Sequence, residues 1–110
     1  GLPSHPNYKA ALKNRADTKF SGGSGMLCFY VKGDIKKTAK LLSSVKLMTL
    51  AESLGGVHTL IQAPAVMTHA SVPPEKRKML GIDDNLVRLS VGIEGTNDLI
   101  GDLKQALAQI

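Results

Sequence analysis

The residues best suited to bind a ligand are an arginine within an apolar run and a serine that precedes a glycine pair. Arg88 lies in LVRLSV, residues 86–91, and Ser53 lies in AESLGG, residues 51–56. An arginine held on a rigid strand offers a planar fork of N–H donors that can take a carboxylate bidentately. A hydroxyl beside glycines, where backbone N–H groups are accessible, can hold an anion. From the residues alone, a solvated or salt-bridged arginine and a turn serine bonded to its own backbone are the commoner arrangements.

The remaining residues with chemical potential form no recognisable catalytic or metal-binding pattern. No spacing typical of metal ligands, and no accompanying acidic residue, joins the three histidines and the single cysteine. These residues are His5, His58, His69 and Cys28. The glycine-rich SGGSG segment runs into an apolar stretch and not into a helix, so it is not a phosphate-binding loop. No nucleophile-elbow sequence marks a hydrolase, and we expect no metal site.

The elements that must position Arg88 and Ser53 can be placed from periodicity and breakers. Helices are predicted over 8–15, from 35, over 73–80 and from 96, and strands over 26–31, 46–51, 57–62 and 86–91. The connections over 51–57 and 62–74 are too short for helical crossovers. The sequence therefore predicts an α+β domain with a mixed, largely antiparallel four-stranded sheet and helices on one face.

The faces of these elements follow from their repeat lengths. In the strand over 86–91, alternation places Val87 on the helix-covered face and Arg88 on the opposite face. The strand over 26–31 is expected to be buried, and His58 is expected within a strand. Helical spacing predicts two core-facing stripes. Their members are Ile35, Ala39, Leu42 and Val45 in one helix, and Leu99, Ile100, Leu103, Ala106, Leu107 and Ile110 in the last.

Length and composition favour one domain without a nucleic-acid partner. The chain has 110 residues, 43% of them hydrophobic, and no apolar run long enough to cross a membrane. Its net charge of +5 is scattered, and only 4% of residues are aromatic, so there is little surface on which bases could stack. One cysteine and no signal-peptide pattern at the start lead us to expect a cytoplasmic location.

Several blocks of the sequence resemble one enzyme family, in order and over nearly the whole chain. They are GLPSHP, GMLCFYVKG, KLMTLAESLGG, PAVMTHASVP, LGI and LVRLSVGIE. They are similar to the C-terminal domain of the pyridoxal-phosphate (PLP) dependent enzymes of Cys/Met metabolism. That family includes cystathionine gamma-lyase, cystathionine gamma-synthase, cystathionine beta-lyase and methionine gamma-lyase. Among these members, the blocks look most like cystathionine gamma-lyase.

The resemblance implies a small domain, residues 1–110, that closes over the active site of a fold-type I PLP enzyme. Residues 1–8 read as a linker-like lead-in. In the family this domain binds the substrate alpha-carboxylate, and its arginine and serine match Arg88 and Ser53. The implied reaction of the whole enzyme is gamma-elimination from cystathionine, and the implied assembly is a homotetramer. Gamma-synthase or methionine gamma-lyase activity and a non-catalytic interaction domain remain open alternatives.

Two positions depart from the family pattern. The family usually has glutamate after the S-L-G-G-x block, often placed to meet the distal ammonium group of cystathionine, and here that position is His58. An imidazole holds an ammonium less well than a carboxylate does, so His58 is a candidate specificity residue. The second departure is Ala63, where many relatives have histidine or another polar residue before Pro64.

The resemblance also implies which functional residues this chain lacks. ADTKF, residues 16–20, resembles the block that holds the cofactor lysine, but it follows GLPSHP, whereas the cofactor lysine precedes that block in the family. Lys19 is therefore expected to be an ordinary surface lysine. The large domain, with the PLP-binding and catalytic residues, is absent from this chain, so we expect the piece to have no catalytic residue and no activity alone.

Overall fold

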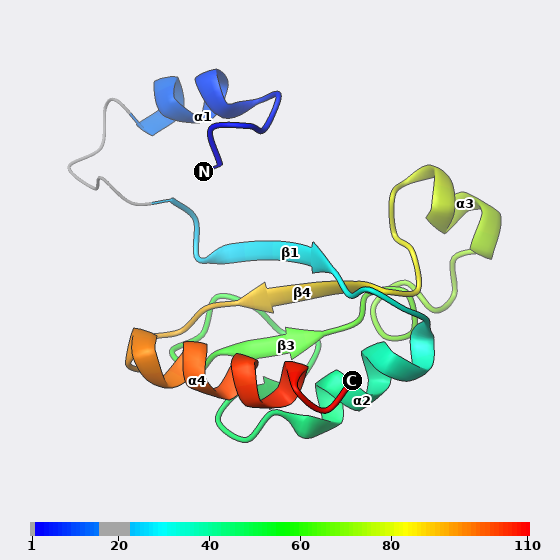
Figure 1. Cartoon of the computed structure of the whole chain (residues 1–110). Helices are drawn as coiled ribbons and strands as arrows, with labels where there is room; N and C mark the ends of the chain where they lie inside the picture. Colours follow the sequence, from blue (N-terminus) through cyan, green and yellow to red (C-terminus); the bar gives the residue numbers. More distant parts are fainter. Residues whose placement is uncertain (1, 16–22) are drawn as a thin grey trace.

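The computed structural model describes residues 2–15 and 23–110, which contain four helices and four strands (Figure 1). Lys19 lies outside the described residues. The helices are α1 (Tyr8–Arg15), α2 (Ile35–Ser44), α3 (Pro74–Met79) and α4 (Thr96–Leu107). The strands are β1 (Met26–Tyr30), β2 (Thr49–Leu50), β3 (Leu60–Gln62) and β4 (Leu86–Ser90).

The four strands form one mixed sheet in the order β1-β4-β3-β2. β4 pairs antiparallel with both β1 and β3, whereas β2 pairs parallel with β3. The parallel pair is joined by a connection that contains no helix, residues 51–59. The predicted α+β class and the mixed, largely antiparallel sheet are confirmed.

Helices α2 and α4 pack against each other and cover one face of the sheet (Figure 1). Asp34 caps α2 by accepting a hydrogen bond from the Lys37 amide at 3.1 Å. The prediction for the buried face of α2 was wrong at Ala39, which is exposed. The helix turns Thr38 and Leu41 toward the sheet, and both are fully buried. The core cluster joins side chains of α2 and α4 to those of the central strands, including Leu41, Ile61, Val87, Leu89 and Leu99.

Helix α4 buries a narrower stripe than its sequence predicts. Ile100 and Leu107 are 46% and 41% exposed, while Leu103 and Ile110 are only partly buried against the core. A carboxylate takes part of the predicted apolar face: Asp102 is only 7% exposed. Its oxygens accept hydrogen bonds from the amides of Lys46, Leu47 and Met48 at 2.8, 2.9 and 2.9 Å. α4 thereby holds the segment that leads into β2.

The strands are shorter and less buried than the apolar runs indicate. β1, predicted to be buried, is an edge strand in which Leu27 is 44% and Tyr30 54% exposed. β3 begins at Leu60, so His58 lies in the preceding loop and not within a strand. The strands are shorter because backbone groups next to them make other hydrogen bonds. The amides of residues 46–48, for example, donate to Asp102 and not to a neighbouring strand, so β2 begins only at Thr49.

Two helices lie away from the core. α1 and α3 contribute no buried residue. α3 lies beyond the edge of the sheet, near the end of β1 (Figure 1), where the Tyr30 hydroxyl donates to the Gly81 carbonyl at 2.8 Å. The prediction of helices on one face therefore holds for α2 and α4 only. In the described part of the chain, no helix combines the length and the apolar character that crossing a membrane requires.

Candidate functional site

Arg88 lies in the middle of β4, on the sheet face that carries neither α2 nor α4. Its neighbours Val87 and Leu89 belong to the core cluster on the helix side, so alternation along the strand turns Arg88 to the opposite side. The predicted face of Arg88 is confirmed. This face is not open everywhere, because Leu86 and Ser90 on the same side of β4 are also buried. Loops therefore cover it around the arginine.

The Arg88 guanidinium is held by two neutral acceptors. Its Nη2 donates to the backbone carbonyl of Glu52 at 2.9 Å. Gln62 is the direct partner of Arg88 across the β3–β4 pair. With the amide orientation that the Gln62 partners require, its Oε1 accepts from both Nε and Nη2 of Arg88. Of the five N–H donors of arginine, the two on Nη1 then have no partner among residues 2–15 and 23–110.

Ser53 lies on residues 51–58, which we call the Ser53 loop. The peptide group that joins Glu52 to Ser53 is the one whose oxygen contacts Arg88, so the serine follows that contact directly in the chain. Ser53 makes no hydrogen bond to Arg88 itself. Its amide and hydroxyl have no protein partner within the described residues, and it is exposed. The two predicted site residues are thus brought to one region without direct contact.

The Ser53 loop is fastened to β4 a second time, three residues beyond Glu52. The Gly55 amide donates to the buried Ser90 hydroxyl at 2.9 Å. Gly55 has a φ of +75°, a conformation that L side chains rarely adopt. The glycine is therefore required by the turn that returns the loop to the sheet.

The far end of the Ser53 loop is fixed by a buried threonine. Thr59 donates its amide to Glu94 Oε1 at 2.6 Å and its hydroxyl to Oε2 at 2.7 Å. The hydrogen bond from the Thr59 hydroxyl has the largest effect and the one from the Thr59 amide the next largest. Together they hold the pKa of Glu94 below its ordinary value, and the nearby His58 lowers it further. The Thr59 hydroxyl also accepts from the Gly92 amide at 2.9 Å. A Cβ at Gly92 would collide with the Val57 carbonyl, so only glycine allows this approach.

The three histidines lie in separate surroundings. The ring of His5 accepts from the Asn7 amide at 3.1 Å, that of His69 pairs with the Thr68 hydroxyl at 2.8 Å, and His58 lies near Glu94. Cys28 is exposed on the edge strand. Within the described residues, no group of three or more His, Cys, Asp or Glu side chains could hold a metal ion.

The charges around Arg88 suit the binding of an anion. Among residues 2–15 and 23–110, no carboxylate forms an ion pair with Arg88, and Asp84 pairs instead with Arg77 at 3.3 Å. Arg88 as a whole residue is half-buried, so its charge is only partly screened by solvent. The unused Nη1 donors and the free polar groups of Ser53 are the donors that a carboxylate requires.

Three contributors to this site were not anticipated from sequence. Gln62 is a polar residue in an apolar run, but its opposition to Arg88 depends on strand register. The Glu52 carbonyl and the Ser90 hydroxyl act through the path of the Ser53 loop. Alternation alone places Ser90 on the Arg88 face, and this is the one signal that could have identified it.

Comparison of the fold with solved structures defines the class of domain. The structure of cystathionine gamma-lyase from yeast is similar, with a TM-score of 0.89 at 49% identity, over 99% of this chain and 27% of that chain. Cystathionine gamma-lyase from Lactobacillus plantarum, solved in complex with L-serine, gives 0.85 at 35% identity, over 100% and 27%. The chain therefore has the fold of the small C-terminal domain of PLP-dependent carbon–sulfur lyases.

Sequence comparison identifies the family. The cystathionine gamma-lyase of Saccharomyces cerevisiae is 51% identical over 109 residues, 99% of this chain and 27% of its own length. That of Dictyostelium discoideum is 53% identical over 107 residues, 97% of this chain and 26% of its own length. The family of Cys/Met metabolism PLP-dependent enzymes matches residues 1–108, and the chain belongs to this family. It spans about a quarter of the length of these relatives.

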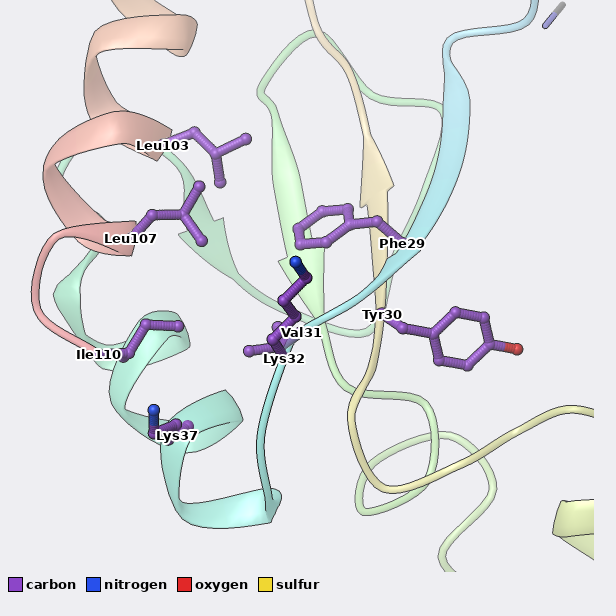
Figure 2. A pocket seen from close by; sticks show the side chains of 8 residues that line it. All are labelled: Phe29, Tyr30, Val31, Lys32, Lys37, Leu103, Leu107 and Ile110. Atoms are coloured by element: carbon purple, nitrogen blue, oxygen red, sulfur yellow. The ribbon is translucent and has the colours of Figure 1, made fainter.

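One cavity of the described residues has a lining that does not suit PLP. A cavity of about 430 Å³ lies between β1, α2 and the end of α4, and Figure 2 shows Phe29 directed toward Leu107 in it while Tyr30 points away. Its lining contains the exposed Lys32 and Lys37 but no acidic residue that could partner the pyridine nitrogen. Its lining residue Phe29 pairs with Val87, so the cavity is on the helix side, opposite Arg88. We assign no cofactor to it.

Proposed function

We propose that the chain is the substrate-binding C-terminal domain of a trans-sulfuration enzyme of the cystathionine gamma-lyase type. The intact enzyme would cleave cystathionine to cysteine, 2-oxobutyrate and ammonia. The observation that carries this proposal is the Arg88 guanidinium, held by neutral acceptors with its Nη1 donors unused beside the Ser53 loop. The high identity to named cystathionine gamma-lyases over almost the whole chain supports it.

The proposed roles of the two domains are supported by the family to which the chain belongs and by the unused donors of Arg88. PLP, held by a large domain of the intact enzyme, would supply the electron sink for the reaction at the substrate. Arg88 and Ser53 bind the alpha-carboxylate and so fix the reacting carbon relative to the cofactor. We assign no catalytic residue to this chain and propose that the piece is inactive alone. The partners are its own large domain and further subunits of a cytoplasmic homotetramer.

Product analysis of the full-length protein tests the activity. Incubation with cystathionine should give cysteine and 2-oxobutyrate in equal amounts, and homocysteine with pyruvate would instead indicate beta-elimination. For the 110-residue chain alone, added PLP followed by borohydride should label scattered lysines without turnover. A single labelled lysine together with turnover would contradict the proposed inactivity of the piece.

Two side chains of the Ser53 loop are candidates to meet the distal ammonium of cystathionine. Glu52 is exposed, has no ion-pair partner in the described part of the chain, and precedes Ser53 directly. His58 stands where the family resemblance leads us to expect an acid, and it lies near a Glu94 carboxylate that is bonded to Thr59. Both residues can therefore influence substrate choice without contributing to carboxylate binding.

Substitution of these two residues should change specificity in opposite directions. Glu52→Gln should raise the KM for cystathionine about tenfold, because an exposed charge pair is lost, while the KM for a monoamino substrate such as homocysteine changes little. His58→Glu should lower the KM for cystathionine by adding a carboxylate. Steady-state kinetics with both substrates measure the effects, and an unchanged or higher KM in His58→Glu would remove His58 from the specificity site.

A further inference from the structure

Gln62 is a buried amide at the centre of the sheet. It ends β3, is 1% exposed, and is followed by Ala63, which is fully buried. A primary amide removed from water costs free energy unless its polar atoms find partners. An aliphatic residue would fill the same space without that cost, so a glutamine here calls for a specific partner.

That partner is the Arg88 guanidinium. Gln62 and Arg88 are opposed across the antiparallel pair of β3 and β4, so their side chains leave the sheet on the same face. Gln62 Oε1 accepts from Nε and Nη2 of the arginine. Both residues are on the central strands of the sheet, which makes this contact more rigid than one made by a loop.

The contact decides which arginine donors remain for a ligand. Gln62 binds the edge of the guanidinium formed by Nε and Nη2. The Glu52 carbonyl accepts the second hydrogen of Nη2. Only the Nη1 side is then available to a carboxylate. A free arginine side chain would sample many rotamers, and a ligand would have to order it on binding.

We propose that Gln62 is a positioning residue for substrate binding, which orders the Arg88 guanidinium and directs its Nη1 donors to the substrate carboxylate. This inference rests on the proposed function of Arg88 as the carboxylate ligand. Gln62 does not touch substrate. It lowers the cost of binding by ordering the arginine in advance, so its contribution should affect KM and not kcat.

The test compares two substitutions in the full-length enzyme. Gln62→Met keeps the length of the side chain but removes the acceptor oxygen, and should raise the KM about tenfold with kcat within about twofold of wild type. Gln62→Glu restores an acceptor that orders the guanidinium but also brings a carboxylate that partly neutralises it, so its KM should lie between those of Gln62→Met and wild type. A Gln62→Met enzyme with unchanged KM, or with an equal loss in kcat, would overturn the proposal.

A second glutamine provides the matched control. Gln105 in α4 donates to the Ser44 carbonyl at 2.7 Å and to Asp102 at 2.9 Å, on the helix side of the sheet. Gln105→Met should lower the melting temperature without raising the KM. If Gln105→Met raises the KM as much as Gln62→Met does, the effect of Gln62 is general destabilisation and the proposal is wrong.

A double-mutant cycle separates this proposal from the proposed function. If Gln62 acts through Arg88, the Gln62→Met substitution should have little effect on KM in an Arg88→Lys background. An undiminished effect there would show that Gln62 acts by another route, although Arg88 would still bind the carboxylate. If Arg88→Lys itself leaves the KM unchanged, the proposed role of Arg88 fails, and the positioning role fails with it.

Discussion

Replacement of Arg88 by lysine in the full-length enzyme should raise the KM for its amino-acid substrate about 100-fold. Lysine keeps the positive charge but presents a compact ammonium that cannot place donors where the Nη1 group of Arg88 lies. It also cannot keep the contacts to Gln62 and the Glu52 carbonyl that orient the guanidinium. Loss of charge-assisted hydrogen bonds costs about 3 kcal/mol, and each 1.4 kcal/mol is tenfold in affinity. Steady-state kinetics measure the change.

Two comparisons tie this result to the carboxylate. Lys36→Met removes an exposed charge from α2 and should leave the KM unchanged, which excludes an effect of net charge. Inhibition by an amino-acid analogue should weaken in Arg88→Lys, whereas inhibition by the amine that lacks the carboxyl group should stay the same. Equal weakening of both inhibitors would contradict carboxylate binding by Arg88.

Replacement of Asp102 by alanine should lower the free energy of unfolding by about 2–4 kcal/mol. The carboxylate is buried and accepts hydrogen bonds from three successive backbone amides, those of Lys46, Leu47 and Met48. Alanine leaves these donors without their partner and opens space beside Met48, which is 5% exposed. Urea unfolding of the 110-residue chain, followed by circular dichroism, measures the loss. Asp98→Asn, an exposed change in the same helix, should cost less than about 1 kcal/mol.

The Asp102 contribution should also depend on pH. Burial alone would raise the pKa of Asp102, but the amides of Met48, Lys46 and Leu47 and the Gln105 side chain together outweigh burial and lower it. Because the folded pKa lies below the unfolded value of about 3.9, folding favours the ionised form. The stabilisation is therefore present above about pH 4 and is lost as the pH falls through the folded pKa. The difference in stability between wild type and Asp102→Asn should shrink in that range, and a difference that stays constant down to about pH 2 would contradict this account.

The number, order and type of the elements could be predicted from the sequence. Helix α1, helix α3 with its proline in the first turn, the start of α4 and strand β4 lie where the local patterns place them. Local periodicity and breakers decide these features, and they depend on residues a few positions apart. The same local reasoning identified the face of Arg88, since alternation along a strand needs no knowledge of its neighbours.

The errors arose where burial depends on what packs against an element. The apolar run over 26–31 reads as a buried strand, but β1 has only one neighbour, so much of it stays exposed. Ala39 lies on the helical stripe drawn through Ile35 and Leu42, yet the contact with α4 and the sheet rotates that stripe toward Thr38 and Leu41. A polar residue on the contact side, Asp102, could not be recognised as buried because its partners are 54 to 56 residues away.

The sequence by itself determined that Arg88 stands on a strand face away from the helices and that Ser53 stands in a glycine-rich turn. Only the tertiary structure decided that these two features meet, through the Glu52 carbonyl 36 positions before Arg88. It also decided that Gln62 faces the guanidinium and that Nη1 is the side left for a carboxylate. The reason is physical: strand register and loop path depend on contacts between distant segments, and these leave no trace in local periodicity.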